Sequence, residues 1–193
     1  MGILYLYKIK NASTTKNTLI MRVFLSAPNL LLYFGNMNDI KFTHELVKGK
    51  IAELIFAQMI RSTDAYTILE FGYEKTLPTL AQMHPKSPAT AETMEIIKRA
   101  PDFTIINHKN KEVHLIEVKY MHELKPTNVL RAARIIEKSW KRAALFLATP
   151  KGFYFDTVSD IILAKGTIKP FRHPKIPTKT QAEYLTLLNE FIS

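Results

Sequence analysis

Two acidic side chains and one lysine, Asp102, Glu117 and Lys119, have the types and spacing needed to act together on a metal ion. Mg²⁺ prefers oxygen ligands and is typically held by one or two carboxylates together with water and a substrate phosphate. A lysine beside such an ion could orient or help to deprotonate an attacking water, or stabilise the charge that develops on a phosphate. The residue types therefore predict phosphodiester hydrolysis, provided that the fold brings these three side chains together.

The segment that carries the three residues has the pattern of a β-hairpin. Two runs rich in β-branched and apolar residues, 103–106 and 113–118, flank a polar turn. If the turn centres on Lys109 and Asn110, Asp102 lies opposite Glu117. Opposed carboxylates normally destabilise a strand pair, which a cation between them would reverse. Lys119 lies two residues beyond Glu117 and so points to the same face. The alternative is a plain surface hairpin with scattered charges.

Pro101-Asp102, followed by Glu117-Val118-Lys119 on the next strand, resembles the motif of the PD-(D/E)XK nuclease superfamily, which has the restriction-endonuclease-like fold. The resemblance implies a metal-dependent nuclease with an αβββαβ core. We expect Asp102 and Glu117 to hold Mg²⁺, or Mn²⁺ in its place, together with the main-chain carbonyl of Val118. We expect Lys119 to position water or to stabilise charge on the phosphate.

A fourth candidate comes from the helix before the sheet. In many nucleases of this superfamily that helix supplies a further acid, and the segment 49–53, Gly-Lys-Ile-Ala-Glu, is similar to its Gly-x-x-x-Glu pattern. The resemblance implies that Glu53 adds a metal ligand or a supporting contact. The alternative is an exposed surface residue, which is usual for a lone helical glutamate.

The expected elements agree with this core. Apolar periodicity predicts helices over 43–61, 91–98, 126–142 and 181–192, with Thr43 as the cap of the first. Strands are predicted over 66–73, in the hairpin, and over 144–148 and 153–158. The fold class is therefore α/β, a mixed central sheet flanked by helices. We expect a β-rich extension over 1–40, the nuclease-like core over 41–163, and a basic arm with a closing helix over 164–193.

The charge balance predicts a nucleic-acid partner, most simply DNA. Lys and Arg number 27 against 17 Asp and Glu, which gives a net charge of +10. Four basic residues recur at three- and four-residue steps along the helix predicted over 126–142, and they would contact phosphates without reading sequence: Arg131, Arg134, Lys138 and Lys141. The alternative is an ordinary solvated helix face.

Several functional classes lack their sequence signals. Without cysteine, disulfide frameworks, thiolate zinc sites and cysteine nucleophiles are excluded. No Gly-rich phosphate loop, GxSxG elbow or HExxH pattern occurs. No apolar run reaches the roughly 18–20 residues of a membrane span, so we expect a soluble, cytoplasmic protein.

The predicted function is Mg²⁺-dependent hydrolysis of DNA, with an endonuclease as the expected form. A homodimer is a further expectation, because many enzymes of the superfamily act as dimers. Two alternatives stay open. One is a nuclease-fold module that binds nucleic acid without turnover, and the other is a basic adaptor for an acidic protein. The sequence does not separate DNA from RNA, or an endonuclease from an exonuclease.

Overall fold

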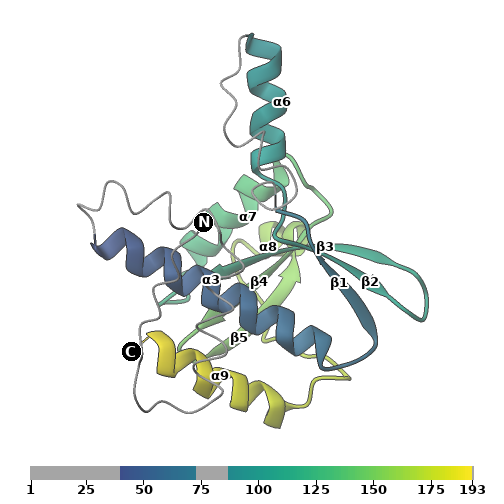
Figure 1. Cartoon of the computed structure of the whole chain (residues 1–193). Helices are drawn as coiled ribbons and strands as arrows, with labels where there is room; N and C mark the ends of the chain where they lie inside the picture. The colour runs from purple at the N-terminus through teal and green to yellow at the C-terminus, as the bar shows by residue number, and fades with distance from the viewer. Residues whose placement is uncertain (1–39, 73–86, 193) are drawn as a thin grey trace, which may run out of the picture. The chain divides into compact units, whose positions relative to one another are not determined.

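In the computed structural model, the described residues are 40–72 and 87–192, and they form an α/β fold with a five-stranded mixed sheet flanked by helices (Figure 1). The spatial order of the strands follows the sequence: β1 (Tyr66–Glu70), β2 (Phe103–Asn107), β3 (Val113–Tyr120), β4 (Ala144–Thr149) and β5 (Gly152–Thr157). All neighbours are antiparallel except β3 and β4, which are parallel. A parallel pair needs a crossover connection, and α7 (Pro126–Glu137) supplies it. The predicted fold class is confirmed at this level, whereas the extension predicted over 1–40 lies almost wholly outside the described residues.

The two faces of the sheet carry different helices. On one face, the ring of Phe56 from α3 (Ile40–Arg61) lies 5.7 Å from that of Phe103 and 4.7 Å from that of Phe146. On the other, α7 and α8 (Val158–Leu163) pack on Leu145 and Leu147. Alternate residues of a strand point to opposite faces, so β4 is buried on both, as its all-apolar sequence predicts.

The hairpin has the predicted register. Phe103 pairs with Ile116, and the N–H of Asn107 donates to the carbonyl of Glu112 at 2.9 Å, which places Asp102 across from Glu117. β2 begins at Phe103, whereas β3 runs on to Tyr120. Among the described residues, no strand therefore pairs with residues 117–120 of β3 on its β2 side. We call this gap at the edge of β3 the notch, and Asp102 lies next to it.

Several helix boundaries differ from those predicted. α3 begins at Ile40, so Thr43 is not its cap. α6 (Pro88–Lys98) begins three residues early, because the Ser87 hydroxyl accepts the N–H of Thr90 at 3.2 Å. α8 was not predicted, although Thr157-Val-Ser-Asp160 has the pattern of a helix cap. No described helix is both long enough and apolar enough to cross a membrane.

The helix predicted over 126–142 ends at Glu137. The N–H groups of Ser139 and Trp140 both bond to the carbonyl of Ile136, at 3.1 and 2.8 Å, which tightens the last turn. The ring of Trp140 then packs edge-on against Phe71, with the ring centroids 5.6 Å apart. The chain therefore leaves the helix axis before residue 141.

The segment predicted as an extended basic arm is packed against the sheet. The N–H of Phe155 donates to the carbonyl of Lys169 at 2.9 Å, and the N–H of Phe171 donates to that of Phe153 at 2.8 Å. Ile168, Phe171 and Ile176 are buried, while the lysines and arginine between them are exposed. Together with α9 (Thr178–Ile192), the segment belongs to the same compact unit, 45–193, as the sheet.

Candidate active site

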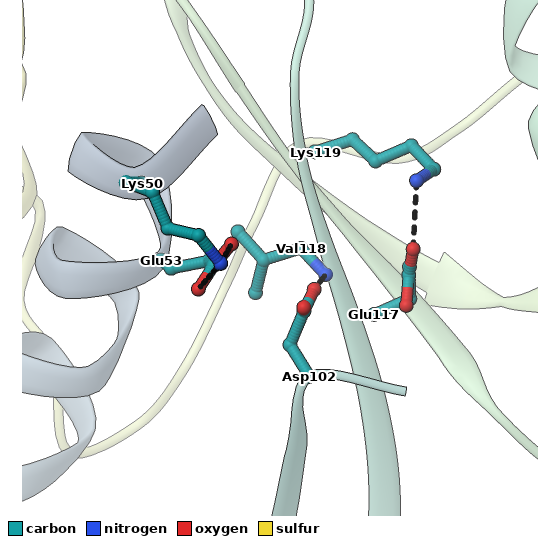
Figure 2. A network of polar contacts seen from close by, with 6 residues as sticks. All are labelled: Lys50, Glu53, Asp102, Glu117, Val118 and Lys119. Atoms are coloured by element: carbon teal, nitrogen blue, oxygen red, sulfur yellow. Dashed lines mark hydrogen bonds and ion pairs between the residues drawn. The ribbon is translucent and has the colours of Figure 1, made fainter. Parts of the chain in front are cut away.

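Asp102 is fixed in the notch by main-chain hydrogen bonds. Its carbonyl accepts the N–H groups of Phe71 and Gly72, at 2.9 and 3.3 Å, and its carboxylate Oδ2 accepts the N–H of Val118 at 2.8 Å (Figure 2). The carboxylate thus accepts the Val118 N–H, which the main chain of a longer β2 would otherwise accept. An N–H and a C=O of one strand residue point toward the same neighbour, so the main-chain carbonyl of Val118 is also directed toward the notch.

The carboxylate of Asp102 lies where negative charge is disfavoured. Burial raises its pKa well above the ordinary aspartate value, and the charges of Glu53 and Glu117 raise the pKa further. The Val118 N–H and the Lys50 ammonium oppose this rise only in part. Because the effects that raise the pKa outweigh those that lower it, a positive charge placed beside Asp102 would stabilise the ionised carboxylate.

Glu117 and Lys119 project from the same face of β3, as predicted. Lys119 Nζ donates to Glu117 Oε1 at 2.7 Å. Leu115, two residues before Glu117, packs in the cluster that α7 and α8 form, so this is the α7 face. Burial lowers the pKa of Lys119, but the charge and hydrogen bond of Glu117 outweigh it, so the pKa lies above the usual lysine value. Lys119 is therefore a cation at neutral pH.

Glu53 comes from α3, on the opposite face, and is 9% exposed, which excludes the alternative of an ordinary surface glutamate. Lys50 Nζ contacts both of its carboxylate oxygens, at 2.8 and 3.0 Å. Figure 2 shows this pair on one side of β3 and the Glu117–Lys119 pair on the other, with Asp102 between them. Lys50 was not predicted, although its three-residue spacing from Glu53 on a helix indicates a pair.

One cavity of about 570 Å³ joins the residues from both faces. Its lining includes all four predicted catalytic side chains, Glu53, Asp102, Glu117 and Lys119, and also Val118. The notch explains how side chains of α3 and of the α7 face reach one space. Sequence reasoning missed a further group that lines it: Lys50, Lys98, Arg99 and Tyr120.

The donor chemistry of the cavity fits a hard cation. The carboxylates of Glu53, Asp102 and Glu117 and a main-chain carbonyl are oxygen ligands of the kind that Mg²⁺ takes, and four basic side chains line the same cavity: Lys50, Lys98, Arg99 and Lys119. The side chains are not gathered around a metal position, however. Each carboxylate bonds to a lysine or to an N–H group, and the part of the chain that the structure describes holds no group of three acidic, histidine or cysteine residues arranged to bind a metal. Metal binding therefore requires side-chain rotation.

The predicted basic stripe is only partly helical. Arg131, Arg134 and Lys138 are exposed on or just after α7, and Lys141 is exposed but lies beyond the helix, in a turn. Ile135 lines the cavity and is 49% exposed. Arg131 and Lys138 lie four residues before and three after Ile135, so they share its side of the helix. Both residues thus lie on the side of α7 that borders the cavity, although neither lines it.

No protein-family model, curated protein or solved structure matches the chain. The functional interpretation therefore depends on the residues of the cavity and on the surface around it.

Proposed function

We propose that the protein is a nuclease that hydrolyses phosphodiester bonds of DNA with Mg²⁺, or Mn²⁺ in its place, on a restriction-endonuclease-like core. The observation that carries the proposal is the shared cavity. Glu53, Asp102, Glu117 and Lys119 come from three separate segments of the chain, and all of them line it. The order α3, β1, β2, β3, α7 and β4, with α6 inserted between β1 and β2, further supports the αβββαβ core.

We assign the roles from the chemistry of each side chain and from the resemblance to the PD-(D/E)XK motif. Asp102 and Glu117 would hold the ion with the carbonyl of Val118, and Glu53 would add a ligand or support from α3. The bound ion would supply Lewis acidity toward a phosphate oxygen and lower the pKa of a water. Lys119 is kept charged by Glu117, so it suits hydrogen-bond donation to the water or the phosphate better than proton abstraction.

The exposed basic residues at the mouth of the cavity would bind the flanking backbone. Arg131 and Lys138, on the same side of α7 as Ile135, would contact phosphates on one side of the scissile bond. Lys98 and Arg99 line the cavity at the end of α6. Both share one ion-pair partner, the exposed Glu95, at 3.5 and 3.7 Å. One carboxylate offsets one of these two charges, which leaves one net positive charge at the end of α6.

Cleavage assays test the proposal directly. Supercoiled plasmid, branched DNA and single-stranded DNA are incubated with Mg²⁺, Mn²⁺ or EDTA, and cutting of the closed circle identifies an endonuclease. We expect Asp102→Asn and Lys119→Met each to lower the rate by about a hundredfold or more, because both remove stabilisation of the reacting groups. Glu112→Gln, an exposed change in the hairpin turn, is the control. Metal-dependent cutting that survives both site substitutions would refute the assignment.

A second candidate is a nuclease-fold module that binds DNA without cutting it. One specific observation favours it. The carboxylates of Glu53, Asp102 and Glu117 each bond to a lysine or a main-chain N–H, and they do not converge on one position where a metal ion could bind. This candidate predicts salt-sensitive DNA binding that is unchanged by EDTA, with no cleavage of any substrate in either metal. The same gels and a binding titration at fixed salt separate the two.

A further inference from the structure

The Glu53 carboxylate, one of the proposed metal ligands, is in contact with Lys50. Lys50 Nζ lies 2.8 and 3.0 Å from the two oxygens of Glu53, and both residues line the cavity. An ammonium group that contacts both oxygens of a carboxylate takes up part of their lone-pair capacity and places a positive charge where it repels a metal ion. Lys119, which also lines the cavity, contacts Glu117 through one oxygen.

We infer that Lys50 is an internal counter-ion that competes with the divalent cation for Glu53, so that cation binding and departure of Lys50 are linked. This inference deepens the proposed function and rests on it. The ammonium and a divalent ion repel each other at such short range. The four-carbon stem of lysine is flexible, and Gly49, the preceding residue, also lines the cavity and has no atom within 4 Å of an added Cβ. Open space therefore adjoins α3 at Gly49, the residue before Lys50.

A second pair on the same helix provides a comparison. Lys48 Nζ bonds to Glu45 Oε1 at 3.1 Å with the same three-residue spacing. The Glu45 side chain is 57% exposed, whereas that of Glu53 is 11% exposed. Exposed pairs of this kind are screened and weak. Removal of either lysine changes the net charge equally and leaves a carboxylate that lines the cavity without its lysine, but only Glu53 is largely buried, whereas Glu45 is exposed to solvent.

Mn²⁺ binding to the full chain without DNA tests the link, by calorimetry and by the electron paramagnetic resonance of the free ion. We expect Lys50→Met to bind Mn²⁺ about tenfold more tightly than the wild type, the scale of one partly screened charge at contact distance. Lys48→Met should stay close to the wild type. Lys50→Arg keeps the positive charge and should not gain affinity.

Thermal unfolding gives a readout that does not depend on catalysis. Without metal, Lys50→Met should melt below the wild type, because the substitution removes the ammonium that Glu53 contacts in a largely buried position. Saturating Mn²⁺ should raise the melting temperature of Lys50→Met more than that of the wild type. Lys50→Gln is the second variant if Lys50→Met does not fold.

The outcomes separate this inference from the proposed function. Wild-type protein that binds Mn²⁺ and cuts DNA, with equal or weaker binding by Lys50→Met, overturns the competition and leaves the nuclease intact. A lowered melting temperature that Mn²⁺ does not correct identifies an ordinary structural ion pair and also overturns it. Absence of Mn²⁺ binding and of cleavage in every variant overturns both.

Discussion

The main chain of Asp102 is held by hydrogen bonds, whereas the surroundings of its carboxylate disfavour the ionised form. Three main-chain N–H groups hold the residue, through its carbonyl and its side chain. Burial and two neighbouring carboxylates raise its pKa. Ligand-binding sites often contain groups that destabilise the fold, and the free energy of ligand binding offsets that loss of stability.

The raised pKa of Asp102 predicts how the stability of the metal-free protein depends on pH. Between the unfolded and folded pKa values, the folded state binds more protons than the unfolded state, so the free energy of unfolding falls as pH rises. This contribution is fully present below the unfolded pKa and is lost as pH rises through the folded value. Asp102→Asn keeps an oxygen for the Val118 N–H and should be about 1 kcal/mol more stable at pH 8.

Urea unfolding at several pH values in EDTA checks this prediction. The difference between Asp102→Asn and the wild type should shrink toward acidic pH, where Asp102 is protonated. Asp156→Asn is a matched control, since Asp156 is buried but accepts a hydrogen bond from the exposed Lys169, away from the cavity. A wild type that gains stability relative to Asp102→Asn as pH rises would contradict the prediction.

At the scale of elements, local pattern was enough to predict the hairpin and its register. The alternation of 103–106 and 113–118 and the polar turn lie within one short segment, so Asp102, Glu117 and Lys119 could be related from sequence spacing. The end of α7 could not be predicted in this way, because it depends on the packing of Trp140 against the distant Phe71. Lys98 and Arg99 were also missed, although they precede Asp102 by four and three residues, a spacing from which their place near the cavity could be predicted.

The junction of α7 and α8 depends on Gly166. This residue has φ +92°, and its N–H donates to the carbonyl of Ile161 at 2.8 Å, which closes α8. A Cβ at Gly166 would lie 2.0 Å from the carbonyl oxygen of Pro126, the first residue of α7. Backbone must therefore move to admit any side chain.

We expect Gly166→Ala to lower the free energy of unfolding by about 3 kcal/mol or more, because it combines a disfavoured φ with a backbone clash. Gly49→Ala is the matched control. Gly49 lies inside α3, has a helical conformation and faces open space, so alanine should stabilise by about 0.5–1 kcal/mol. Chemical denaturation measures both. Equal stability of the two variants would show that the close approach to Pro126 is not a constraint.

At the scale of the molecule, positive charge is unevenly placed around the cavity. The exposed residues Arg131, Arg134 and Lys138 lie on or next to α7, which borders the cavity through Ile135 and Ile136. Other exposed basic residues, Lys165, Arg172 and Lys175, lie on the segment that packs along β5. Net charge alone could be read from the sequence, but which charges border the cavity depends on the fold.

Replacement of Arg131, Arg134 and Lys138 by alanine should weaken DNA binding at all sequences. The dependence of log K on log salt should fall by about one for each lost phosphate contact. The control replaces Lys165, Arg172 and Lys175, which removes the same number of charges. Fluorescence anisotropy over a salt series, in EDTA, measures both. An equal loss in the control would indicate attraction by total charge rather than by the α7 surface.

The pairing of residues 169–171 along β5 has a practical consequence. β5 is an edge strand of the sheet, and without this segment its main-chain donors and acceptors would be open to another chain. The ring of Phe146 would also lose its packing on Phe171. A shortened protein that stops after α8, at residue 163, would keep every proposed catalytic side chain. We nevertheless expect it to aggregate during expression, so the smallest usable fragment must extend through α9.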